Sequence, residues 1–145
     1  MSNLELRSEP EMQTNTTKTI MVIDDERIVG NLIKRIMEKS GYSAIVCSSS
    51  LEALLATERT TPELIISDFN LPSYSDGVDL CLRIRQSTNK NMPVIIISGQ
   101  AENEIKARQK GFEFMCKPLS KNKLLLLVES CLNGSERMYY QRGRI

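Results

Sequence analysis

Short apolar runs alternate with amphipathic segments along most of the chain. The apolar runs are typical of buried strands, and they occupy residues 19–24, 42–48, 62–67, 92–99 and 112–116. Apolar residues recur at helical spacing in the segments between and after these runs, at residues 28–37, 49–59, 78–86, 102–110 and 121–132. Five strands that alternate with five helices predict an α/β fold, in which a doubly wound parallel sheet is covered by helices on both faces.

Both ends of the chain lack this alternation. We predict a flexible N-terminal arm over residues 1–18, a single domain over 19–133 and a C-terminal tail over 134–145. The arm lacks the basic and then apolar layout of a secretory signal, which predicts a cytoplasmic protein. The arginines and tyrosines of the tail could contact nucleic acid or a partner, although we favour the interpretation of a solvated tail.

The composition is that of a globular protein without a strong electrostatic preference for one kind of partner. Of the 145 residues, 41% are hydrophobic and 26% are charged, and the formal net charge is +1. Binding to nucleic acid is therefore not expected as the main activity, and no apolar run is long enough to span a membrane. The chain has no histidine, which excludes Ser-His-Asp and Cys-His catalysis and a phosphohistidine on this chain.

The four cysteines are spread along the sequence without the close pairs that zinc sites need. They are Cys47, Cys81, Cys116 and Cys131, and each lies in an apolar context, so we interpret them as small core residues. An alternative for Cys116, which directly precedes a lysine, is a thiol of lowered pKa that responds to oxidation.

Four of the five predicted strands end in a reactive polar group. Asp24 and Asp25 follow the first strand, Asp68 the third, Ser98 the fourth and Lys117 the fifth. The carboxyl ends of the strands of such a sheet lie at one edge, so these side chains are expected to gather there. Three converging carboxylates repel each other by about 4 kcal/mol per close pair, and a hard cation such as Mg²⁺ would offset that repulsion.

This combination of groups suggests phosphoryl transfer. The Asp68 carboxylate can attack phosphorus as a nucleophile and form an aspartyl phosphate. Magnesium and the Lys117 ammonium would neutralise charge on the phosphoryl oxygens, and Ser98 would donate a hydrogen bond to the new phosphoryl group.

Four short motifs, in this order and spacing, are specific together. They are "DD" at 24 and 25, "SDFNLP" around Asp68, "IISG" with Ser98 and "CKP" with Lys117. With them, the sequence resembles a receiver domain of bacterial-type two-component response regulators over about residues 19–133. The resemblance implies a flavodoxin-like fold of five strand-helix units with the strand order 2-1-3-4-5.

The resemblance also implies roles for the residues at the sheet edge. Asp24, Asp25 and Asp68 would hold Mg²⁺ together with the backbone carbonyl of Asn70. Asp68 would accept a phosphoryl group from the phosphohistidine of a separate histidine kinase or histidine phosphotransfer protein. The loop between the third strand and the next helix is one residue longer than the commonest family pattern.

A second set of implied roles concerns switching. Ser98 matches the hydroxyl residue that engages the phosphoryl group, and Phe114 matches the aromatic residue that turns inward when it does. The frequent residue at the position of Phe114 is tyrosine, so this chain lacks a hydroxyl there. The family pattern also implies a cis bond between Lys117 and Pro118.

We therefore expect a phosphorylation-activated signalling switch and not an enzyme acting on other substrates. No output domain is expected after the last helix, so output would occur by docking on a target protein or by phosphorelay. The predicted binding face comprises the fourth helix, the fifth strand and the fifth helix, and the same face is a candidate homodimer interface. One alternative is a magnesium-dependent phosphatase or phosphotransferase. Asn70 argues against it, because a phosphatase of the dehalogenase type needs a second acid two positions after the nucleophile. The other alternative is a degenerate receiver that acts as a constitutive adaptor.

Overall fold

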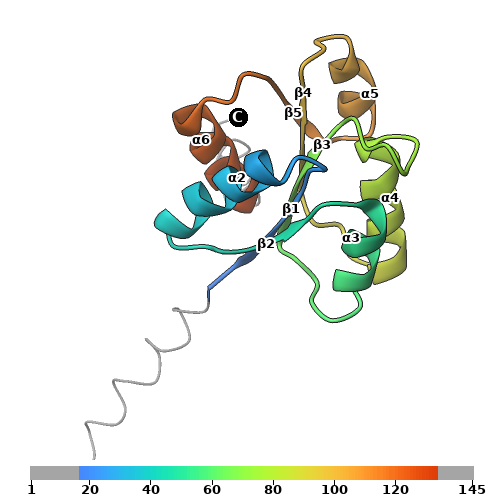
Figure 1. Cartoon of the computed structure of the whole chain (residues 1–145), viewed down its shortest axis with the longest axis horizontal. Helices are drawn as coiled ribbons and strands as arrows, with labels where there is room; N and C mark the ends of the chain where they lie inside the picture. Colours follow the sequence, from blue (N-terminus) through green and yellow to red (C-terminus); the bar gives the residue numbers. More distant parts are fainter. Residues whose placement is uncertain (1–16, 134–145) are drawn as a thin grey trace, which may run out of the picture.

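The computed structural model of the protein describes residues 17–133. The predicted C-terminal tail lies outside the described residues, as does the predicted N-terminal arm except for its last two residues, so both stay predictions. The labels of helices and strands below follow Figure 1.

Five parallel strands form one sheet with the order β2-β1-β3-β4-β5, which confirms the predicted fold class and strand order. The strands are β1 (Thr19–Ile23), β2 (Ser43–Cys47), β3 (Leu64–Asp68), β4 (Val94–Ser98) and β5 (Glu113–Cys116). β3 and β4 are buried along their whole length, because helices cover both faces of the centre of the sheet.

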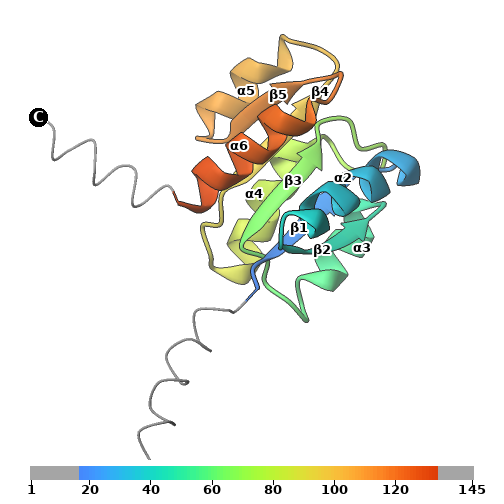
Figure 2. The same cartoon turned by 90° about the vertical axis from the view of Figure 1, so that its left-hand side faces the viewer.

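Five helices alternate with the strands. They are α2 (Arg27–Lys39), α3 (Ser50–Ala56), α4 (Gly77–Thr88), α5 (Asn103–Gln109) and α6 (Lys121–Leu132). Helices α2 and α6 cover one face of the sheet, and α3, α4 and α5 cover the other (Figures 1 and 2). α3 ends three residues earlier than predicted, and a turn follows it at Thr57.

Alternating side chains of the strands feed two separate hydrophobic cores. Ile20 and Val22 of β1 contact the core under α2 and α6, whereas Met21 and Ile23 contact the core under α3, α4 and α5. The register of β1 and β3 pairs Ile23 with Ser67. The residues that follow these strands therefore reach the same edge of the sheet at the same level.

The prediction that all four cysteines are core residues is wrong for Cys116. Cys47 and Cys81 are buried, and Cys131 is partly buried and packs against the core under α2 and α6, but Cys116 is exposed. Cys116 is the last residue of β5, and β5 has a neighbouring strand on one side only, so burial within the sheet does not extend to this position.

Candidate functional site

Three carboxylates meet at the carboxyl edge of the sheet. Asp24 and Asp25 follow β1, and Asp68 is the last residue of the adjacent strand β3. Each contributes a carboxylate oxygen to a cluster in which these oxygens lie within 4.8 Å of one another. Asp24 and Asp68 are buried, and Asp25 is exposed. The structure thus brings together the three acids that the sequence pattern predicted to gather.

Burial makes ionisation of two of these acids unfavourable. It raises the pKa of Asp24 to about 6, although the backbone N–H of Glu26 donates a hydrogen bond of 2.9 Å to Asp24 Oδ1 and opposes the shift. Burial also raises the pKa of Asp68, and the Lys117 ammonium and the backbone N–H of Asn70 act in the opposite direction. The cluster therefore favours a cation or a proton among its oxygens.

Lys117 supplies positive charge on another side of Asp68. Its Nζ lies 3.6 Å from Asp68 Oδ2, and its side chain is only partly exposed. The backbone N–H of Lys117 donates a hydrogen bond of 2.8 Å to the carbonyl of Ser98, which continues the pairing of β4 with β5. The bond between Lys117 and Pro118 is cis, as the family resemblance implied.

The two residues predicted to act in switching are both buried. The Ser98 hydroxyl oxygen accepts hydrogen bonds from the backbone N–H of Gln100 at 3.0 Å and from Asn103 Nδ2 at 2.9 Å. Phe114 is 8% exposed and packs in the core under α3, α4 and α5. Ser98 is thus held by the segment that leads into α5, and the ring of Phe114 points inward.

A cavity of about 530 Å³ opens beside the acidic cluster. Asp25, Asp68 and Lys117 line it together with residues of the loop between β3 and α4, which include Asn70 and Tyr74. The longer loop noted in the sequence therefore forms a wall of the cavity. Asp68 is therefore accessible from this cavity.

Sequence reasoning missed three residues that support this loop. The Asp76 carboxylate accepts a hydrogen bond of 2.8 Å from the backbone N–H of Asp79 and thereby caps α4. Lys106 of α5 lies 2.6 Å from Asp76 Oδ2 and 3.1 Å from Asp79 Oδ1. Gly77 lies directly against the backbone of Asp68. An aspartate three residues before a second acid is a capping signal that could have revealed Asp76.

The raised pKa of Asp24 leads to a prediction for the metal-free protein. The pKa of Asp24 in the folded protein, about 6, exceeds the ordinary value of 3.8, so folding favours the protonated carboxyl group. The stability that this group contributes is therefore lost as the pH rises from about 4 through 6, and it is not regained above that range. Asp24→Asn should therefore raise the free energy of unfolding by about 2 kcal/mol at pH 7.5 and by much less at pH 4.5. Thermal unfolding in EDTA at both pH values measures this, and a larger gain at pH 4.5 would contradict it.

Comparison with known proteins adds the family. The model of the response regulator receiver domain matches residues 20–129. The chain is 32% identical over 122 residues to the alkaline phosphatase synthesis transcriptional regulatory protein PhoP of Bacillus subtilis, covering 82% of this chain and 50% of that protein. It is 31% identical over 123 residues to the polar-differentiation response regulator DivK of Brucella ovis, covering 82% of this chain and 99% of DivK.

A solved structure agrees with these relatives. A response regulator receiver domain protein of Clostridium thermocellum superposes with a TM-score of 0.74 at 28% identity, covering 83% of this chain and 98% of that one. The chain spans about half the length of PhoP but nearly all of DivK. Within residues 17–133, no helix has the length and apolar character needed to cross a membrane. On the strength of the family match, the chain belongs to the response regulator receiver domain family.

Proposed function

We propose that the protein is a phosphorylation-activated signalling switch whose phosphoryl acceptor is Asp68. The observation that carries this proposal is the position of the Asp68 carboxylate, which lies 3.6 Å from the Lys117 ammonium, clusters with Asp24 and Asp25, and lines a cavity. A receiver domain implies a kinase partner, and we propose a histidine kinase or a histidine phosphotransfer protein as the donor. Exchange with such a donor would take place in the cytoplasm.

In the proposed transfer, an oxygen of the Asp68 carboxylate attacks the phosphorus of the donor's phosphohistidine. A P–O bond forms while the P–N bond breaks, and the released imidazole nitrogen keeps the electron pair and can take up a proton from solvent. The Lys117 ammonium stabilises negative charge on the phosphoryl oxygens. Ser98 would donate its hydrogen bond to the phosphoryl group after transfer, and that exchange would couple Asp68 to the rest of the molecule.

The donor set fits a magnesium ion. The three clustered ligands are carboxylate oxygens, which a hard divalent cation prefers, and the triad is typical of the receiver magnesium site. We propose that Asp24, Asp25, Asp68 and the backbone carbonyl of Asn70 hold the ion. Bound Mg²⁺ would neutralise negative charge on the transferring phosphoryl group. The raised pKa of Asp24 supports this assignment, because a cation would relieve the same cost of burial.

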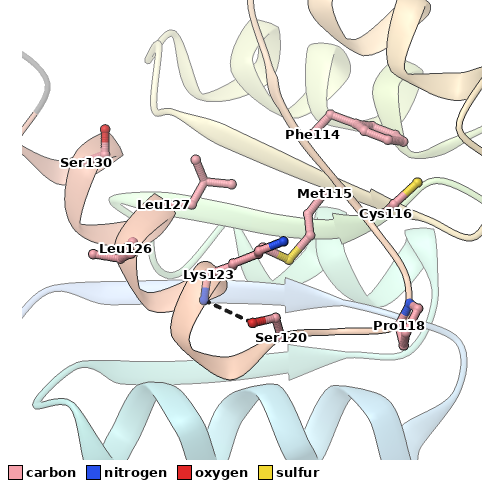
Figure 3. A pocket seen from close by; sticks show the side chains of 9 residues that line it. All are labelled: Phe114, Met115, Cys116, Pro118, Ser120, Lys123, Leu126, Leu127 and Ser130. Carbon is pink, nitrogen blue, oxygen red and sulfur yellow. Dashed lines mark hydrogen bonds between the residues drawn. The ribbon is translucent and has the colours of Figure 1, made fainter.

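For output, we propose the face formed by α5, β5 and α6. An apolar cavity of about 640 Å³ lies there between β5 and α6, and Figure 3 shows Met115 and Leu127 beside it. Ile105 of α5 is 65% exposed and Leu126 of α6 is 66% exposed. Apolar side chains exposed on both helices support docking of a target protein or of a second copy of the chain.

Incubation with acetyl phosphate tests the proposed acceptor chemistry. In Mg²⁺ the intact mass should rise by one phosphoryl group, located on the peptide that contains Asp68, and the reaction should be at least about tenfold slower in EDTA. A chain that stays unmodified would favour the constitutive adaptor. Repeated release of phosphate from many donor molecules, at a rate far above that of the isolated phosphoprotein, would favour the phosphatase.

A further inference from the structure

The Ser98 hydroxyl has no hydrogen-bonding capacity left. A hydroxyl can donate one hydrogen bond and accept two. Ser98 Oγ accepts from the backbone N–H of Gln100 at 3.0 Å and from Asn103 Nδ2 at 2.9 Å, and it donates to the Gln100 carbonyl at 3.3 Å. The side chain is completely buried, so water does not compete for these bonds. All three partners lie in the segment that follows β4.

This arrangement opposes the role proposed for Ser98. To donate to a phosphoryl group on Asp68, the hydroxyl must withdraw its proton from the Gln100 carbonyl, and turning about its Cα–Cβ bond breaks the accepted bonds as well. The bond from the Asn103 amide is the shortest of the three and comes from a side chain, so it can be released without moving the backbone. Asn103 Nδ2 also donates to Gln100 Oε1 at 3.3 Å, so the amide keeps a second acceptor within reach.

We propose that Asn103 is a positioning residue that holds the Ser98 hydroxyl in the unphosphorylated orientation. Phosphorylation of Asp68 then has to displace the Asn103 amide before Ser98 can engage the phosphoryl group. This inference rests on the proposed function, because it names the residue that opposes the reorientation of Ser98 after phosphorylation. Asn103 touches neither the acceptor nor the metal ligands in this role and acts only through Ser98.

The rest of α5 is held independently of this hydrogen bond. Lys106, one turn after Asn103, lies within ion-pair distance of Asp76, which caps α4, and of Asp79 on α4, and Ala107 is buried in the core. Removing the Asn103 amide should therefore free Ser98 while α5 stays in place. Asn103 itself is partly exposed, so in the wild type its amide can bond to water once it is released from Ser98. Substitution at such a position rarely unfolds a protein, and we expect Asn103→Ala to fold.

The experiment measures binding of beryllium trifluoride, a mimic of the phosphoryl group, to the full chain in saturating Mg²⁺ by ¹⁹F NMR. Asn103→Ala should bind it about two- to tenfold more tightly than the wild type, the factor expected for one neutral hydrogen bond that no longer has to be broken. Asn122→Ala is the matched control, because Asn122 lies in the first turn of α6 and is exposed. It should bind like the wild type.

The same substitution in a Ser98→Ala background separates positioning from a general structural effect. Without the hydroxyl there is nothing for the amide to hold, so Asn103→Ala should change the affinity by less than about twofold in that background. Equal affinities of wild type and Asn103→Ala, or an equal gain with and without Ser98, would overturn the inference alone. Failure of the wild type to bind beryllium trifluoride, or undiminished binding by Asp68→Asn, would instead overturn the proposed function.

Discussion

Replacing Asp68 by asparagine is expected to abolish phosphorylation of the protein and, at the same time, to raise its thermal stability. The amide lacks the negative charge that makes the carboxylate a nucleophile towards phosphorus. The stability gain has a separate cause. Burial raises the pKa of Asp68 despite the nearby Lys117 ammonium, so the ionised carboxylate costs folding free energy at neutral pH, and a neutral amide of the same shape removes that cost.

The measurement combines intact mass after incubation with acetyl phosphate and Mg²⁺ with thermal unfolding in EDTA at pH 7.5. The midpoint for Asp68→Asn should rise by roughly 3–6 °C, which corresponds to a gain of about 1 kcal/mol in a domain of this size. A variant modified to the same extent as the wild type would remove Asp68 as acceptor. If the variant is unmodified but much less stable than the wild type, loss of folding would explain the missing phosphorylation, and the predicted gain in stability would be contradicted.

Asp79→Asn provides a control with the same change of charge. The pKa of Asp79 is lowered, first by the hydrogen bond that Ser75 donates to it at 2.6 Å and also by Lys106, so here folding favours the ionised form. This variant should be phosphorylated like the wild type, and its stability should fall instead of rising. If the two substitutions change the stability in opposite directions, the gain at Asp68 comes from the surroundings of Asp68 and not from the change of charge itself.

The acidic cluster was predictable because its members are set by strand ends alone. A polar residue directly after a buried strand must lie at the carboxyl edge of a parallel sheet, whatever the angles at which the helices pack. Asp24 directly follows β1 and Asp68 is the last residue of β3, and the same condition places Lys117 after β5, so their separation along the chain does not matter. Family resemblance then supplied roles for them that the pattern of apolar and polar residues does not contain.

Contacts between helices were not predictable in the same way. The ion pair between Lys106 and Asp76 depends on how α5 packs beside α4, and residues 30 positions apart give no pattern in the sequence. The hydrogen bond from Asn103 to Ser98 depends on the path of the short segment between β4 and α5. Exposure of Cys116 was missed because its apolar neighbours in sequence suggested burial, although the implied strand order already placed the fifth strand at the edge of the sheet.

The position of Gly77 has a steric cause that involves the acceptor itself. A Cβ atom added there would lie 2.1 Å from the backbone carbonyl oxygen of Asp68 and 2.9 Å from Ser67 Oγ. The backbone N–H of Gly77 also donates a hydrogen bond of 2.7 Å to the Phe69 carbonyl. The first residue of α4 therefore lies directly against the end of β3. The nearest atom belongs to the backbone, so a change of side-chain rotamer cannot make room for a Cβ atom.

Gly77→Ala is accordingly expected to lower the free energy of unfolding by about 3 kcal/mol, because either β3 or α4 has to shift. Gly99→Ala is the matched control: an added Cβ there meets no atom within 4 Å, so the change should stay within about 1 kcal/mol. Urea unfolding of both variants measures the difference. Since the shift would move Asp68, the folded fraction of Gly77→Ala should also accept phosphoryl groups more slowly. A Gly77→Ala protein as stable as Gly99→Ala would show that the end of β3 and the start of α4 are not in close contact in solution.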